Sequence, residues 1–381
     1  MPPFWNSLKP GPYAVGFRVL YHRDRSRRWL KKKGPAVSDL GRPIRISLWY
    51  PASPSVSDHQ MTYGDYLHHL GPNDFRQFDE QLDKMDADSW LSDFRELTPP
   101  GQPMFDKLLS TPTAAYRNAP AAHGSFPLVL YSGGKGSRAD DNVELGEFLA
   151  SYGYVVATVP QLGPSDEELE LGSSPQEISL HADDFDAALS VLGQLPEVNF
   201  HKIATAGHSA GGEAAVELAL RHPQVRAVVG LDASYGMTSG ARIFKQLPEY
   251  APGRDIDAAL LDLRRAEGSQ GVKLDLDAID ALHWTAVYRV AFEKAYHGDF
   301  TEWGMVAWKL SIPMPTNRYG HTRRIGYNVN RSACRAVLDF LEAQLRGRSE
   351  ALGDLQRAMQ QEPGVAFSHF SVSIQPSAVK K

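Results

Sequence analysis

The feature that most constrains this fold is an apolar run that passes through a glycine-flanked turn into a second apolar run. Residues 202–208 have the composition of a strand, and residues 212–220 have the pattern of a helix. Between them lies Gly-His-Ser-Ala-Gly, at residues 207–211. The small residues at its ends allow strand and helix to approach closely, and the central serine is held on a strained turn. This order predicts a layered α/β protein.

Ser209, at the tip of this turn, is the candidate nucleophile. A serine hydroxyl becomes reactive only when it is exposed, fixed and within reach of a base. The following helix would direct its unpaired N–H groups and positive dipole end at the place where an anionic intermediate forms. A five-residue pattern rich in glycine also occurs by chance, but a strand before it and a helix after it favour the nucleophile.

Composition excludes several classes of protein. The 381 residues are 42% hydrophobic and 22% charged, with a net charge of −5, so no basic surplus suggests nucleic acid or an anionic membrane as a partner. Cys334 is the only cysteine, which excludes an intrachain disulfide and a zinc–cysteine cluster, and we expect a buried, inert thiol. No apolar run approaches the roughly 18 residues of a membrane span.

The amino terminus has no basic segment followed by an apolar core. We therefore expect a cytoplasmic protein, with a secreted or periplasmic location as the alternative if a leader precedes these residues. The sequence leaves the oligomeric state open.

Residues 1–52 predict the first strands of the main domain. Residues 13–23 alternate apolar and polar side chains, and residues 42–51 do so again before a proline, so together they predict a hairpin-like edge.

Residues 53–120 interrupt this pattern with Pro- and Ser-rich stretches and acidic amphipathic pieces, and we interpret them as an inserted helical cap. Whether this segment covers the site or decorates a distant surface stays open. Its aromatic side chains are candidates for receiving the bulky side of a substrate, namely Tyr63, Tyr66, Phe75, Trp90 and Phe94.

Residues 121–347 alternate strands with helices and predict the catalytic core. The strands are expected at 128–131, 154–160, 202–208, 225–231, 258–263 and 288–295, and the helices at 142–152, 174–195, 212–220 and 332–344. We expect residues 348–381 to be a polar tail that is disordered toward its end. The fold class is α/β, with a mainly parallel central sheet flanked by helices and reactive groups at the strands' carboxyl ends.

Thirteen histidines compete for the role of base. His297 follows the last predicted strand in a turn that would return the imidazole over the serine. His321 is the second candidate, although the arginines after it suggest an exposed loop. His208 lies inside the motif and is expected to pack beside it, pointing away from the serine oxygen, and His283 is assigned to an amphipathic helix as a structural residue.

The acid that orients the base is assigned to Asp232, which ends the strand after the serine turn. Asp262, in the next strand, is the alternative, but it lies within an apolar run. The non-catalytic alternative for any such aspartate is a structural role as a helix cap or a turn residue.

The oxyanion hole requires two backbone donors. One is the N–H of Ala210, and the other is the N–H of Lys135, with Gly134 as the neighbouring candidate, in the turn Gly133-Gly134-Lys135-Gly136. A phosphate-binding loop does not fit this turn, because no Gly-x-x-x-x-Gly-Lys-Ser/Thr pattern is present.

These residues together resemble the α/β-hydrolase superfamily, and within it the platelet-activating-factor acetylhydrolase-like branch close to the dienelactone hydrolases. The resemblance rests on residues 126–134, on residues 207–212 and on the short spacing from Ser209 to Asp232. It implies hydrolysis of carboxylic esters through an acyl-serine, with no metal and no cofactor. The chain departs from this resemblance at Gly133-Gly134, where relatives commonly carry His-Gly.

The sequence therefore predicts a serine esterase acting on a small-molecule or lipid-like ester, with short-chain acyl esters as the first expectation. A polyester or lipid hydrolase with the same triad is an alternative within the enzymes. A non-catalytic binding protein on a hydrolase fold is the alternative from another class, since fold alone does not establish activity.

Overall fold

The computed structural model describes residues 4–5, 7–29, 41–69, 71–97, 104–165, 168–170, 172–311 and 319–370, without the side chains of 89–97, 104–105 and 168–170. Within these residues an 11-stranded sheet has the order β15-β14-β12-β10-β9-β5-β6-β2-β1-β4-β3. Its strands are β1 (Ala14–Asp24), β2 (Arg42–Ala52), β3 (Gln60–Thr62), β4 (Pro112–Arg117), β5 (Phe126–Ser132), β6 (Val155–Thr158), β9 (Val198–His208), β10 (Val225–Leu231), β12 (Ala259–Arg265), β14 (Val287–Phe292) and β15 (Val365–Phe370).

The strands from β6 to β14 are parallel to one another, whereas β2 and β15 join this block antiparallel at its two ends. The predicted mainly parallel sheet is therefore confirmed. Two small ribbons lie outside it, one of β7 (Leu162–Ser165) with β8 (Glu168–Glu170) and one of β11 (Asp255–Ile256) with β13 (His283–Trp284).

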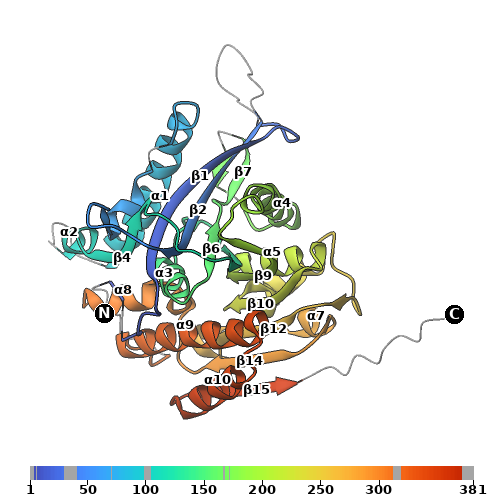
Figure 1. The fold of residues 1–381 in the computed structure, drawn as a ribbon. Helices are drawn as coiled ribbons and strands as arrows, with labels where there is room; N and C mark the ends of the chain where they lie inside the picture. Colours follow the sequence, from blue (N-terminus) through green and yellow to red (C-terminus); the bar gives the residue numbers. More distant parts are fainter. Residues whose placement is uncertain are drawn as a thin grey trace.

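Helices cover both faces of the sheet (Figure 1). One face carries α3 (Val143–Ser151), α8 (Trp303–Lys309), α9 (Arg323–Arg346) and α10 (Glu350–Gln361), and the other carries α4 (Pro175–Leu192), α5 (Ala210–Arg221), α6 (Thr238–Phe244) and α7 (Asp277–Asp280). Strand side chains alternate between the two layers, so that Val129 and Tyr131 belong to the first core and Leu128 and Leu130 to the second. Because helices cover both faces of these strands, their side chains are apolar on both faces.

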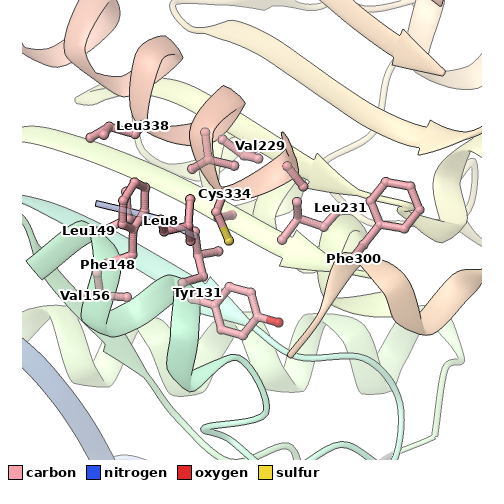
Figure 2. Close-up of a cluster of buried hydrophobic side chains, with 14 of the residues drawn as sticks. Leu8, Tyr131, Phe148, Leu149, Val156, Val229, Leu231, Phe300, Cys334 and Leu338 are labelled. Carbon is pink, nitrogen blue, oxygen red and sulfur yellow. The ribbon is translucent and has the colours of Figure 1, made fainter. Parts of the chain in front are cut away.

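Cys334 lies on α9 inside the first core. Figure 2 shows its thiol among apolar side chains that include Tyr131, Phe148 and Leu231. Burial raises the pKa of this thiol well above its usual range, which keeps it protonated and unreactive. The expectation of a buried, inert cysteine agrees with this environment.

The sequence predicted a helical insert, but the insert also contains strands. It contains the 3-10 helix η1 (Tyr63–Leu67), α1 (Arg76–Leu97) and α2 (Met104–Leu109), but also β3 and β4, which extend the sheet beyond β1. Strand β4 pairs with β1 and β3 pairs with β4, and these partners supply hydrogen bonds that the sequence of the two short strands does not predict. Tyr63, Tyr66 and Phe75 are buried, so they offer no surface to a substrate, and the side chains of Trp90 and Phe94 lie outside the described residues.

The segment after Gly347 is also more ordered than predicted. It forms α10, whose Leu355 and Met359 are buried against α9, and then β15, which pairs with β14. The segment is polar overall, but α10 carries one narrow apolar stripe, and this stripe packs against α9. His283 belongs to β13 and not to a helix, and it is exposed next to Asp255.

Leu355→Ala tests whether α10 is an integral part of the fold. Leu355 is fully buried, so removing its side chain is expected to lower the free energy of unfolding by about 2–5 kcal/mol, measured by urea denaturation. Leu352→Ala, on the half-buried side of the same helix, is the control and should lose clearly less. Equal losses for the two variants would show that α10 is not docked as described.

Candidate active site

Ser209 occupies a sharp turn between β9 and α5. Its backbone has φ 53° and ψ −125°, a strained conformation for a residue with a side chain. A Cβ built on Gly207 would overlap the backbone of Gly211, and one built on Gly211 would overlap the carbonyl groups at the end of β5. The two glycines are therefore required for strand, helix and neighbouring strand to approach this closely.

Asp232 and His297 meet close to this turn. Asp232 follows β10, and His297 begins the 3-10 helix η4 (His297–Phe300) after β14. His297 Nδ1 lies 2.5 Å from Asp232 Oδ2. Because an ionised carboxylate can only accept, Nδ1 carries the proton and Nε2 is left with a lone pair. The imidazole is one-third exposed, whereas Asp232 is 2% exposed, so the base can meet a substrate while its partner stays shielded.

Arg265, at the end of β12, holds Asp232 in its ionised form. Its backbone N–H donates to Oδ1 at 3.0 Å and its Nε donates to Oδ2 at 2.6 Å. Burial alone would raise the pKa of Asp232, but the hydrogen bond from His297 and the charge of Arg265 outweigh burial and hold the pKa below its usual value. The Gln270 side chain accepts from both Arg265 Nη1, at 2.8 Å, and the backbone N–H of His297, at 3.1 Å.

The sequence reasoning did not find Arg265 or Gln270. Arg265 lies at the carboxyl end of a predicted strand next to the one that supplies Asp232, and this position was its only signal. Gln270 lies in an irregular turn, where no periodicity of the sequence predicts its position.

The hydroxyl of Ser209 lies 3.3 Å from the hydroxyl of Ser234, two residues after Asp232. Within the described part of the chain, no hydrogen bond joins Ser209 Oγ to His297. Catalytic hydrogen bonds in unliganded enzymes are often long or misaligned and tighten when substrate binds, so the two groups remain compatible with proton transfer. Ser234 is a further residue that the sequence reasoning missed.

The glycine turn after β5 lies against the serine. A Cβ built on Gly134 would be 3.1 Å from Ser209 Cβ, and the Ser137 N–H closes the turn onto the Gly134 carbonyl at 3.0 Å. Ala210 is the first residue of α5, so its N–H has no partner within the helix. Gly134 and Ala210 therefore both lie next to Ser209, with Lys135 beside Gly134 and its side chain exposed.

His208 packs beside the turn, as expected. Burial lowers its pKa to about 3, with the neighbouring His297 as a second cause, so its ring is neutral near pH 7. His208 Nε2 lies 3.0 Å from the backbone carbonyl of His297 and must be the donor, and the two rings lie 4.4 Å apart. His208 therefore supports the position of His297.

The alternatives to the assigned base and acid have other partners. His321 is buried, not on a loop surface, and its Nε2 lies 2.9 Å from Asp299 Oδ2. Asp299 in turn accepts from the backbone N–H of Tyr296, which makes His321 a support of the turn that carries His297. Asp262 is buried between Arg264, at 3.0 Å, and Arg289, at 3.3 Å.

Two kinds of site are not found among the described residues. No group of three or more His, Cys, Asp or Glu side chains there could hold a metal ion. Of the helices in this part of the chain, none is long and apolar enough to cross a membrane.

Comparison with known proteins agrees with this architecture. The model of the chlorophyllase family matches residues 104–255. A solved structure described as a ferulic acid esterase from Streptomyces cinnamoneus, at 2.4 Å resolution, superposes with a TM-score of 0.66 at 24% sequence identity. The superposition covers 95% of this chain and 98% of that one. No curated protein matches the chain in sequence.

The strand order, the serine turn and the superposition define the fold class as that of the α/β hydrolases. Membership of the α/β-hydrolase superfamily, and the branch within it, stay predictions from the sequence.

Proposed function

We propose that this protein is a serine esterase in which Ser209, His297 and Asp232 form the catalytic triad. The observation that carries the proposal is the His297–Asp232 hydrogen bond, fixed by Arg265 and positioned next to a strained serine turn. The match to the chlorophyllase family and the likeness to a ferulic acid esterase support ester hydrolysis as the class of activity.

In the proposed reaction, Ser209 Oγ attacks the ester carbonyl while its proton passes to His297 Nε2. The tetrahedral intermediate collapses, the C–O bond to the alcohol breaks, and the alcohol leaves with that proton. A water molecule then attacks the acyl-serine and gives a proton to the same nitrogen. The bond between the acyl carbon and Ser209 Oγ breaks, the proton returns to Oγ, and the acid is released. Asp232 stays ionised throughout and stabilises the imidazolium that forms twice in each cycle.

The oxyanion is proposed to receive two backbone hydrogen bonds, one from Ala210 and one from Lys135 or Gly134. Each donor of this kind contributes about 10²–10³-fold to the rate in serine hydrolases, because it meets charge that develops only in the transition state. The contact between Gly134 and Ser209 supports the assignment of this turn.

Short-chain acyl esters are the proposed substrates, and the ferulic acid esterase adds methyl ferulate as a probe of an aromatic acyl group. We propose that the insert at residues 53–120 supports the site from behind and does not receive the substrate through Tyr63, Tyr66 or Phe75, since these side chains are buried. A lipid or polyester hydrolase would instead require an open, exposed apolar groove at the site.

Covalent labelling tests the nucleophile. Treatment with a fluorophosphonate is expected to add one adduct to the wild type, seen by intact mass, and none to Ser209→Ala, because only an activated serine reacts at an appreciable rate. Turnover of p-nitrophenyl acetate, butyrate and octanoate and of methyl ferulate would be measured alongside. Absence of both adduct and turnover in the wild type would favour a non-catalytic binding protein.

The base is tested by comparing two histidines. His297→Ala should lower kcat by about 10⁴-fold or more, since it removes the proton acceptor of the triad. His321→Ala should lower it far less, because His321 Nε2 binds Asp299, which supports the turn and takes no part in the proposed proton transfer. The measurement is steady-state hydrolysis of p-nitrophenyl acetate, and the reverse ranking would overturn the assignment of the base.

The pH dependence of kcat/KM gives an independent test. Activity is expected to fall toward acidic pH, because a protonated imidazole cannot accept the serine proton. Since the pKa of Asp232 is held below its usual value, this carboxylate stays ionised over the measured range and adds no second limb near pH 5. A flat profile from about pH 5 to 8, with chemistry rate-limiting, would contradict the mechanism.

A further inference from the structure

Glu302 is a buried carboxylate where three separate parts of the chain meet. Its Oε1 accepts from the Tyr63 hydroxyl of the insert and from Arg138 Nη2, at 3.2 Å, in the loop after β5. Its Oε2 accepts from the backbone N–H of Val143, at 3.0 Å, where α3 begins. Glu302 itself follows η4, the turn that opens with His297. We call Tyr63, Arg138 and Glu302 the Glu302 node.

The Glu302 node joins the two segments that carry the proposed chemistry. Arg138 lies three residues after Lys135 in the loop of the oxyanion turn, and Glu302 lies five residues after His297. Asn142 Nδ2 adds a parallel link by donating to the Phe300 carbonyl at 3.3 Å. A displacement of the node would therefore move the oxyanion donors and the base relative to one another.

The node is buried, which makes it dependent on every hydrogen-bond partner. The side chains of Arg138 and Glu302 are 4% and 6% exposed, and the Tyr63 ring is fully buried below the arginine. Burial raises the pKa of Glu302 to about 8, so the fold maintains this carboxyl against an electrostatic cost. In such surroundings, removing one hydrogen-bond partner leaves the others to rearrange.

We propose that Glu302 is a positioning residue for the proposed esterase, and that Tyr63 is the contact through which the insert fixes the oxyanion turn relative to the base. This inference rests on the proposed function. It assigns the insert a role in turnover that requires no contact with substrate.

The chain offers a matched control for this proposal. Tyr63 and Tyr66 lie on the same 3-10 helix, both are buried, and each hydroxyl donates to a buried glutamate. Tyr66 binds Glu147, which lies on α3 and touches neither the oxyanion turn nor the base in any described hydrogen bond. Phenylalanine at either position removes one hydroxyl and leaves the ring.

Tyr63→Phe is expected to lower kcat for p-nitrophenyl acetate by about tenfold to a hundredfold, with KM changed less than about twofold, because misplaced donors weaken only the transition state. The rate of fluorophosphonate labelling should fall in parallel. Tyr66→Phe should lower the melting temperature by a similar amount but keep kcat within about twofold of the wild type.

The outcomes separate the two proposals. A wild type that neither labels nor turns over overturns the proposed function and this inference with it. An active wild type with the same kcat in Tyr63→Phe overturns only this inference, as does an equal loss of kcat in both tyrosine variants. If Tyr63→Phe does not fold, Glu302→Gln, which keeps the side-chain volume and replaces the carboxyl with an amide, is measured in its place and must show the same loss of kcat at nearly constant KM.

Discussion

The close approach of three backbones at the serine turn is the constraint on which the rest of the site depends. Gly207 and Gly211 leave no room for a side chain, so β9, α5 and the end of β5 are in direct contact there. That contact places the start of α5 and the glycine turn after β5 close to Ser209. A bulkier residue at either glycine would separate these elements and with them the proposed donors of the oxyanion hole.

Parallel strand order then supplies the remaining groups. Neighbouring parallel strands end at the same edge of the sheet, so β10 brings Asp232 and β12 brings Arg265 to adjacent positions. The acid is therefore held from the strand next to it, and it needs no support from solvent. Asp262, which also lies on β12, is removed from this role by its own pair of arginines.

The sequence predicted most of what regular secondary structure determines. A strand, a glycine turn and a helix predict the turn at Ser209 from local pattern alone, and the position of Asp232 at the end of the next strand is predicted in the same way. Strands β3, β4 and β15 were not predicted, because each is short and owes its hydrogen bonds to a partner distant in sequence.

The supports of the site escaped prediction for a related reason. Gln270, Ser234, His321 and Glu302 lie in turns, where position in space follows from tertiary contacts and not from periodicity. His321 illustrates the difficulty, since two following arginines suggest an exposed loop, whereas its imidazole is buried against Asp299. Sequence patterns report the groups at strand ends far better than the residues that hold them.

The contacts of the insert with the sheet argue against its being a mobile cap. A mobile cap would pack loosely and expose its polar groups, but Arg45 on β2 is fully buried and pairs with Asp79 and Asp83 of α1. Breaking such a buried pair leaves an uncompensated charge, so these contacts resist separation of the insert from the sheet. Together with Tyr63 at the Glu302 node, they hold the described part of the insert against the sheet and against the loop after β5.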